Sequence, residues 1–434
     1  MVFAVAGYFK RIKVKGTHHL RVKGPVIIAM NHPNSFADPI AFTTVIYPPR
    51  VFYLARGDAF KKGIVTVLLE SLGIIPIFRI QDAGKEGLKK NDETYERVNT
   101  LLKRNKKIII FAEGLCIQER RLRPLKKGVP RMLFGAMEEH DLKDLIVVPV
   151  GANYSKPADF RSNLFYNIGA PIKVQDYMDA YRQSPAKTMN QFIADLYPKM
   201  KELIVHINDI QSETVIAHLE EIYQYDFFKS RKLKRHDPEH QFMLSTSITE
   251  VINNVQKDQP EKITRLQEKT SAYMNTLEKE KIKDWLMIPE KQSSVNYLYL
   301  SARIVFIILS IPVYLRGIAG NIIPYLITDS FVNKKVRILE FKTSFRLGVG
   351  ALLFLIFYIA QFFIAKALAP NAWWALLVIT VSALTGYACL YLSPFRKKTK
   401  GIYRMLKIRS SQPQLVTSLA AQRQEILRLY KELM

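Results

Sequence analysis

Cysteine is almost absent from this chain, which has only Cys116 and Cys389 among its 434 residues. Two cysteines so far apart in the sequence cannot build a disulfide framework or a metal cluster, so the composition predicts a protein of a reducing compartment with no bound metal. A signal-peptide pattern is also missing, because the apolar run within residues 1–8 is short and basic residues follow it instead of preceding it. We therefore expect the first 300 residues to stay in the cytoplasm.

Acidic residues are scarce relative to basic ones. The chain has 64 Lys and Arg against 38 Asp and Glu, a formal net charge of +26. A basic surface of this size fits either nucleic acid or an anionic membrane. The sequence has no helix-turn-helix spacing, zinc-finger spacing or aromatic RNA-binding signature. We therefore expect the partner to be an anionic lipid bilayer and not nucleic acid.

Long apolar runs are missing from the first 300 residues and appear only afterwards. Residues 344–368 and 372–395 are each long enough to span a bilayer, and three residues separate them, which predicts a transmembrane hairpin. Lys and Arg cluster before the first run and after the second. By the positive-inside rule both ends of the hairpin belong on the cytoplasmic side.

Residues 303–328 are apolar but are interrupted by Pro312, Arg316, Gly317, Gly320 and Pro324. Neither part of this segment is long enough to span a bilayer alone. If the residues before and after it are both cytoplasmic, the segment must enter and leave on one side. We therefore predict a re-entrant or interface-lying broken helix, and a single proline-kinked span is the alternative.

Short, nearly continuous apolar runs alternate with helical stretches over residues 1–175. This alternation favours an α/β fold, with a mostly parallel sheet covered by helices. The predicted strands are residues 9–14, 26–30, 51–54, 74–78, 107–112 and 145–152, and the predicted helices are residues 40–46, 66–72 and 94–103.

Polar residues follow three of these strands where each one ends. His32 and Asp38 follow the strand at 26–30, Arg79 follows the strand at 74–78, and Glu113-Gly114 follows the strand at 107–112. Active sites of parallel sheets lie beyond the carboxyl ends of the strands. A histidine can take a proton from an alcohol, and a carboxylate can fix its tautomer. The alternative for residues 31–39 is a surface turn in which Asp38 caps a helix.

Four short motifs in this order resemble those of the glycerolipid acyltransferase family, which includes the 1-acylglycerol-3-phosphate acyltransferases. They are residues 31–38 (NHPNSFAD), 73–79 (GIIPIFR), 111–116 (FAEGLC) and 147–151 (VVPVG), and the resemblance covers roughly residues 15–175. It implies transfer of an acyl group from acyl-CoA or acyl carrier protein (acyl-ACP), as co-substrate, to 1-acylglycerol-3-phosphate or glycerol-3-phosphate in phospholipid biosynthesis. No bound cofactor is implied.

The resemblance also implies residue roles. His32 would be the general base and Asp38 its partner, Arg79 would bind a phosphate, Glu113 and the Gly114 amide would position the glycerol backbone, and Pro149 would shape the wall beside the base. Each of these residues also has a purely structural alternative. Arg79 would be a solvated cation at a strand end, Glu113 would cap a turn, and Pro149 would stiffen an edge of the sheet. A thiol mechanism through Cys116 competes with packing of this residue as a small hydrophobe.

The chain departs from the family pattern at two places. Five residues separate His32 from Asp38 where the family usually has four, a longer spacing that some glycerol-3-phosphate acyltransferases share. In the third motif, Ala112, Leu115 and Cys116 replace the usual Pro, Thr and Arg. A phosphate ligand is therefore missing, and Lys126, Lys127 or Arg131 could replace it. The departures leave the acceptor less defined than the reaction.

The sequence predicts four regions in all. They are a catalytic domain at 1–175, a charged helical region at 176–300, a membrane region at 301–395 and a cytoplasmic tail at 396–434 that contains a short amphipathic helix. We thus expect an integral membrane protein with its catalytic domain on the cytoplasmic face. The alternatives are an enzyme for another lysophospholipid or an aminolipid, and a non-catalytic membrane scaffold with a degenerate acyltransferase domain.

Overall fold

The computed structural model describes residues 2–46, 51–57, 60, 63–71, 73–78, 80–140, 142–369 and 371–434, which fold into two compact units. The first unit comprises Met1–His206 together with Ile338–Ser344. The second comprises Ile207–Arg337 and Phe345–Met434. The catalytic-type motifs thus belong to a unit that extends past residue 175 and includes a short segment from much later in the chain.

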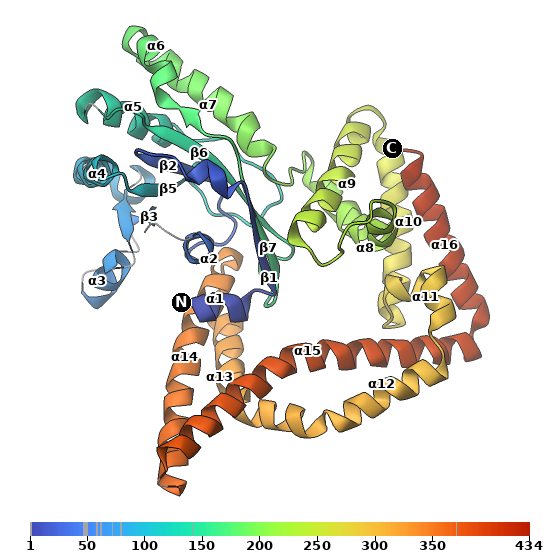
Figure 1. The fold of residues 1–434 in the computed structure, drawn as a ribbon. Helices are drawn as coiled ribbons and strands as arrows, with labels where there is room; N and C mark the ends of the chain where they lie inside the picture. The colour runs from blue at the N-terminus through green and yellow to red at the C-terminus, as the bar shows by residue number, and fades with distance from the viewer. Residues whose placement is uncertain are drawn as a thin grey trace. The chain divides into compact units, whose positions relative to one another are not determined.

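A mostly parallel sheet forms the centre of the first unit, which confirms the predicted fold class (Figure 1). Within the described residues it has eight strands in the order β1-β7-β6-β2-β5-β3-β4, and β8 also pairs with β6. The β6·β7 and β6·β8 pairs are antiparallel, and the other five pairs are parallel. The strands are β1 (Arg11–Lys15), β2 (Val26–Met30), β3 (Val51–Arg56), β4 (Ile74–Ile77), β5 (Lys107–Phe111), β6 (Ile146–Tyr154), β7 (Asn163–Ile168) and β8 (Ile172–Lys173).

Helices cover both faces of this sheet. On one face Ile27, Ile108 and Val147 pack against apolar side chains of α4, α5 and α7, and on the other face Phe42 of α2 contacts Tyr166 of β7. Val26–Met30 of β2 are fully buried because this central strand is covered on both sides. The helical elements of this unit are α1 (Val2–Tyr8), η1 (Thr17–Leu20), α2 (Ala37–Val45), α3 (Ile64–Ser71), α4 (Ile80–Lys103), α5 (Gly128–His140), η3 (Val174–Tyr177), α6 (Met178–Gln183) and α7 (Pro185–Lys201).

The six predicted strands correspond to β1 to β6, with ends that differ by up to two residues, and the predicted helices correspond to parts of α2, α3 and α4. Strands β7 and β8 were not expected. Asn163 and Asn167 interrupt the apolar pattern of β7, and β8 has only two residues. Both are recognisable only through their pairing with β1 and β6, which is a tertiary contact.

The second unit contains a helical core with a buried ion pair. Arg423 of α16 is 2% exposed, and its Nε lies 2.9 Å from Oδ1 of Asp284, which also accepts a hydrogen bond from Tyr273 at 2.8 Å. The predicted charged region and tail therefore share one core. Its elements are η4 (Ile210–Ser212), α8 (Glu213–Ser230), α9 (Pro238–Asp258), α10 (Pro260–Lys279), η5 (Asp284–Met287), α11 (Pro289–Ser294) and α16 (Pro413–Lys431), with the end of α15.

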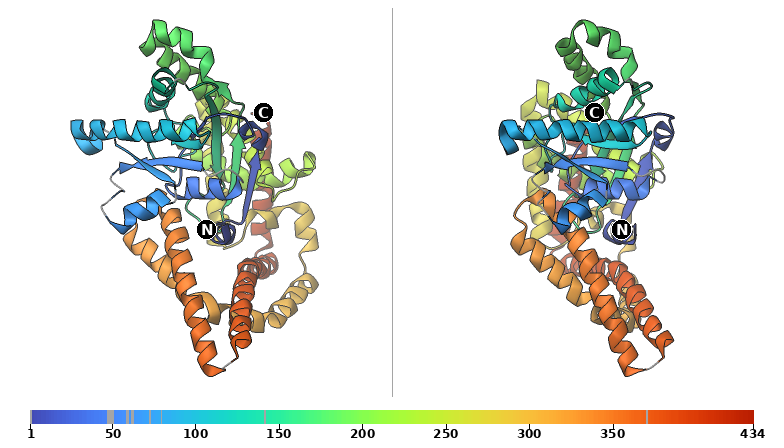
Figure 2. Two further views of the ribbon diagram at one scale, coloured as in Figure 1. Left: turned by 60° about the vertical axis from the view of Figure 1, so that its left-hand side comes forward. Right: turned by 90° about the vertical axis from the view of Figure 1, so that its left-hand side faces the viewer.

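Among the residues that the structure describes, two helices are long and apolar enough to cross a membrane, α14 (Leu339–Leu368) and α15 (Ala372–Ser411). They form the predicted hairpin, which Figure 2 shows in orange and red. The segment at 303–328 lies in α12 (Tyr297–Leu309) and α13 (Ile311–Lys335), which meet at a 50° bend, the geometry of a broken span or a re-entrant loop. Pro370, in the connection of the hairpin, lies outside the described residues.

A polar network joins α13, α14 and α15. Ser382 Oγ accepts a hydrogen bond from Arg316 at 2.8 Å and donates one to Gln361 Oε1 at 2.9 Å, and Gln361 Nε2 donates to the Gly320 carbonyl at 2.9 Å. An added Cβ at Gly317 would lie 2.5 Å from the Thr385 carbonyl oxygen, so only glycine permits this approach. Small residues and interhelical hydrogen bonds are the contacts that hold helices together in a bilayer.

Candidate active site

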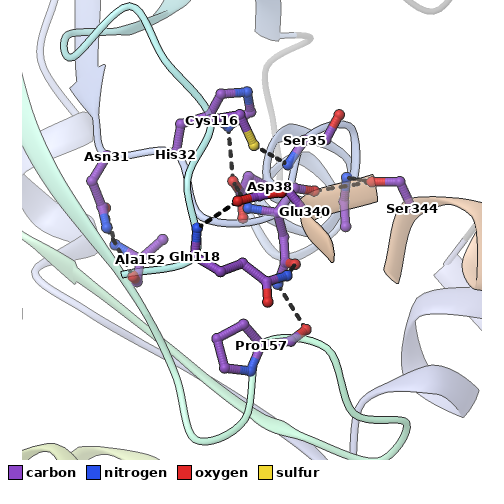
Figure 3. A network of polar contacts seen from close by, with 12 residues as sticks. Asn31, His32, Ser35, Asp38, Cys116, Gln118, Ala152, Pro157, Glu340 and Ser344 are labelled. Carbon is purple, nitrogen blue, oxygen red and sulfur yellow. Dashed lines mark hydrogen bonds and ion pairs between the residues drawn. The ribbon is translucent and has the colours of Figure 1, made fainter. Parts of the chain in front are cut away.

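His32 and Asp38 form a hydrogen-bonded pair at the carboxyl end of β2 (Figure 3). The distance from His32 Nδ1 to Asp38 Oδ2 is 2.9 Å, and the side chains are 16% and 0% exposed, respectively. Asp38 also accepts hydrogen bonds from Asn34 N at 2.8 Å and from the Tyr154 hydroxyl at 2.6 Å. Because the carboxylate accepts all three hydrogen bonds, Nδ1 carries the proton, and the lone pair of Nε2 faces away from this contact.

The turn between the two residues absorbs the longer spacing. Ser35 adopts a left-handed conformation with φ 42°, and the Ala37 amide donates to the Asn34 carbonyl at 2.9 Å. Helix α2 has Phe36 at its N-cap position, so Asp38 lies inside the first turn and does not cap the helix. The carboxylate turns back toward His32 instead. The structure therefore brings together the pair that the sequence identified, and the capping alternative is wrong.

Two tyrosines of neighbouring strands support the aspartate. Besides the Tyr154 contact, the Tyr166 hydroxyl donates to the main-chain carbonyl of Asp38 at 2.9 Å. The pKa of both phenols is raised well above its usual range, mainly by burial and to a lesser extent by the negative charge of Asp38. Both hydroxyls therefore remain hydrogen-bond donors. Neither tyrosine was predicted as a site residue, because β6 extends beyond its predicted end and β7 was not predicted.

The histidine ring and its strand are also held in place. The ring stacks on Phe111 of β5, with centroids 3.5 Å apart and an interplanar angle of 14°. The side chain of Asn31 forms two hydrogen bonds with the main chain of Ala152 on β6, at 2.7 and 3.1 Å. These contacts fix the point at which the chain leaves the sheet, and so they preorganise the position of His32.

Glu113 is buried behind the pair, with 7% of its surface exposed. Its carboxylate accepts hydrogen bonds from the main-chain amides of Arg123, at 2.9 Å, and His32. Burial raises its pKa to about 7. Gly114 has φ 65°, and its amide donates to the Phe111 carbonyl at 3.0 Å. Glu113 thus links the loop that carries His32 to the loop that contains Arg123.

The raised pKa of Glu113 predicts a pH-dependent stability. Between pH 4.5, the ordinary pKa of a glutamate, and about pH 7, Glu113 has lost its proton in the unfolded chain but keeps it in the folded chain. The free energy of unfolding therefore falls as pH rises through this window. Glu113→Gln keeps an acceptor oxygen but does not ionise. We therefore expect its thermal midpoint, relative to wild type, to rise between pH 4.5 and 7 and to level off above pH 7. Thermal unfolding scans that give the same difference in midpoint between Glu113→Gln and wild type at every pH would contradict this.

The two remaining predicted site residues have different outcomes. Pro149 is buried in β6. It pairs with Ala29 of β2, and Ala29 lies three residues before His32 in the sequence. The Pro149 carbonyl accepts a hydrogen bond from the Gly169 amide at 2.9 Å. Pro149 lies where β6 stops pairing with β8 and starts pairing with β7, so the N–H that proline lacks removes no hydrogen bond from either antiparallel pair. Arg79 lies outside the described residues. Within the described part of the chain, no three His, Cys, Asp or Glu side chains are grouped as metal ligands would be.

Cys116 lies beside the turn and does not resemble an activated nucleophile. Its Sγ accepts a hydrogen bond from Ser35 N at 3.0 Å, and burial, followed by the charge of Asp38, raises the thiol pKa above its usual range. Activated cysteines have a lowered pKa. We expect Cys116→Ser, which keeps an acceptor for Ser35, to retain turnover within about twofold of wild type. Trapping of a radiolabelled acyl-cysteine in the wild type would contradict this.

Part of this chain is similar to known acyltransferases. A family model described as "Acyltransferase" matches residues 11–153. Glycerol-3-phosphate O-acyltransferase 1 of Saccharomyces cerevisiae is 29% identical over 136 residues, covering 31% of this chain and 18% of the yeast protein. An uncharacterized acyltransferase of Schizosaccharomyces pombe is 20% identical over 301 residues, covering 50% of this chain and 45% of the relative. This chain therefore spans less than half the length of these relatives.

A solved structure is also similar to part of the chain. The crystal structure of the 1-acyl-sn-glycerophosphate (LPA) acyltransferase PlsC from Thermotoga maritima aligns at 14% identity with a TM-score of 0.32, covering 44% of this chain and 71% of the other. The family model falls on residues 11–153, which contain β1 to β5, most of β6 and the His32–Asp38 pair. Within the first unit, residues 11–153 therefore match an acyltransferase domain.

Proposed function

We propose that this chain transfers a fatty acyl group from a thioester to a hydroxyl of a glycerolipid acceptor. The observation that carries the proposal is the His32–Asp38 pair, in which the buried carboxylate fixes the Nδ1–H tautomer of a histidine at the end of a parallel strand. In this tautomer Nε2 can take a proton. The arrangement is equivalent to the histidine–aspartate half of a serine protease triad, with the acceptor alcohol in place of the serine.

The reaction needs no enzyme nucleophile. As the acceptor oxygen attacks the thioester carbonyl carbon, its proton passes to Nε2 of His32, and Asp38 stabilises the imidazolium that forms. The tetrahedral intermediate then collapses, the carbon–sulfur bond breaks, and the thiol leaves with the proton from the imidazolium. The products are an ester and a free thiol, and His32 is neutral again.

We propose 1-acylglycerol-3-phosphate or glycerol-3-phosphate as acceptor. Arg79 is the proposed phosphate ligand, since a guanidinium binds phosphate in a bidentate manner. Lys126 is a second proposed phosphate ligand, and its side chain passes beside Gly114, where its Cγ would lie 3.1 Å from an added Cβ. Glu113 and Gly114 are proposed to position the glycerol backbone, and Pro149 the wall beside the base. The names of the yeast relatives point to the same acceptor chemistry.

The proposed donor is acyl-CoA or acyl-ACP, both of which are acidic and suit a chain of net charge +26. The catalytic unit is proposed to face the cytoplasm, where the basic residues on both sides of the hairpin belong. Cysteine labelling that places Asn333 on the opposite side of the membrane from the N-terminal unit would contradict this orientation.

An acceptor panel tests the proposal. Purified full-length protein in phosphatidylglycerol-containing vesicles receives a radiolabelled acyl-CoA or acyl-ACP and one acceptor at a time: glycerol-3-phosphate, 1-acylglycerol-3-phosphate, a lysophospholipid with a headgroup, or an aminolipid. We expect labelled product with one of the two phosphomonoesters. A product only with the other acceptors would favour the alternative lysolipid enzyme, and no product with any acceptor would favour the scaffold.

A further inference from the structure

A short segment from the C-terminal third of the chain belongs to the first unit, which contains the His32–Asp38 pair. Ile338–Ser344 is grouped with Met1–His206, although more than 130 residues separate the two parts in the sequence. The residue that follows it, Phe345, continues α14, the first of the two helices long enough to span a membrane. We call Ile338–Ser344 the docking segment.

Ser344 of the docking segment contacts the turn between His32 and Asp38 (Figure 3). Its hydroxyl accepts a hydrogen bond from Ala37 N at 2.9 Å and donates one to the Asn34 carbonyl at 3.0 Å. These are the main-chain groups on either side of Ser35 and Phe36, where the longer His–Asp spacing is accommodated. One hydroxyl from a distant segment thus contacts both of the main-chain groups whose direct hydrogen bond closes the turn from which Asp38 reaches His32.

A second set of contacts surrounds this one. Gln118 donates through Nε2 to Asn34 Oδ1 at 2.6 Å and to the Leu339 carbonyl at 3.3 Å, and its main-chain amide donates to Glu340 Oε1 at 3.3 Å. The Thr343 hydroxyl donates to the Pro157 carbonyl at 2.7 Å, and the same carbonyl accepts from Asn34 Nδ2 at 3.0 Å. Asn34 is therefore held from several directions, and two of its neighbours contact the docking segment.

We infer that the docking segment is part of the catalytic machinery, with Ser344 as a positioning residue for the His32–Asp38 pair. This inference rests on the proposed acyl transfer. Asn34 N donates to Asp38 Oδ2 at 2.8 Å, so a shift of Asn34 moves the carboxylate that orients the base. A displacement of about 1 Å in a catalytic group can lower a rate about 100-fold. The pair is then fully formed only when the start of α14 is docked.

The kinetic test compares Ser344→Ala with Ser344→Thr in the full-length protein in vesicles. We expect kcat of Ser344→Ala to fall about 10- to 100-fold, while KM for the acyl donor stays within about twofold. Ser344→Thr retains the hydroxyl and should recover most of kcat. Thr380→Ala is the matched control, because it removes a membrane-helix hydroxyl that donates to the Leu376 carbonyl within its own helix at 2.8 Å.

Alkylation of Cys116 by a maleimide, quantified by peptide mass spectrometry, provides a second readout. Cys116 Sγ accepts from Ser35 N in the same turn, so loosening of the turn should speed alkylation in Ser344→Ala and not in Thr380→Ala. A wild-type kcat or an unchanged alkylation rate in Ser344→Ala would overturn the inference. The inference would also be overturned if Ser344→Thr lost as much kcat as Ser344→Ala and had a lowered thermal midpoint. Disturbed packing, and not the lost hydroxyl, would then explain the lower rate.

The two readouts separate this inference from the proposed function. If the wild type transfers no acyl group to any acceptor, the proposed function fails, whereas the alkylation rates still report whether Ser344 holds the turn. If the wild type is active and Ser344→Ala is equally active, only the role of the docking segment fails.

Discussion

Replacing His32 with alanine should abolish acyl transfer, with a fall in kcat of about 10³-fold or more. The variant removes the only group that we assign to take the proton from the acceptor, and general base catalysis by a positioned side chain contributes about 10² to 10⁴. The preorganised histidine, held between Asp38 and the Phe111 ring, adds the advantage of correct orientation. The measurement is the initial rate of labelled ester formation at saturating donor.

Two further variants separate loss of the base from loss of the fold. His32→Gln can still donate to Asp38 but cannot act as a base, so it should be as inactive as His32→Ala while retaining a wild-type thermal midpoint. His18→Ala removes an exposed histidine of the same unit and should leave the rate unchanged. Activity of His32→Gln above a tenth of wild type would exclude the histidine as general base.

Replacing Asp38 with asparagine should lower kcat about 10³- to 10⁴-fold with little change in KM. The substitution keeps the size of the side chain, but its NH₂ group would donate to His32 Nδ1 and thereby place the imidazole proton on Nε2. His32 would then present a donor, and not an acceptor, to the substrate hydroxyl. The buried site also loses the charge that stabilises the imidazolium.

Tyr154→Phe is the matched control for this variant. It removes the hydroxyl that donates to Asp38 Oδ1 at 2.6 Å but leaves the carboxylate and its contact with His32. Its kcat should fall less than about tenfold, since one donor to a carboxylate that keeps two others is lost. A rate for Asp38→Asn equal to that of Tyr154→Phe would mean that the aspartate only supports the turn.

The core of the site was predictable because its residues follow buried strands directly. The apolar run at 26–30 indicates a central strand, and the parallel arrangement brings the strand ends together, so the meeting of His32 with Asp38 and the position of Glu113 near them follow from local sequence. The extra residue between His32 and Asp38 is accommodated in the turn that joins them. The left-handed conformation of Ser35 lets the chain turn back, and this depends on contacts that the local sequence does not contain.

The supporting residues could not be predicted in the same way. Tyr154 and Tyr166 reach Asp38 because β6 extends to residue 154 and pairs antiparallel with β7. Ser344 reaches the turn from the first two turns of α14. Nothing in the neighbourhood of these residues in the sequence marks them as partners of Asp38. The one available signal was the aromatic and polar character of residues 153–154 just beyond a predicted strand end.

The measurement that tests the central claim most directly follows both products in one sample. Wild-type protein in vesicles receives acyl-CoA and 1-acylglycerol-3-phosphate, and free thiol and new ester are quantified together by absorbance and mass spectrometry. We predict equal amounts of thiol and ester in the wild type and neither above background in His32→Gln. Thiol release without ester would identify a thioester hydrolase, and ester formation that persists in His32→Gln would contradict the catalytic role of the His32–Asp38 pair.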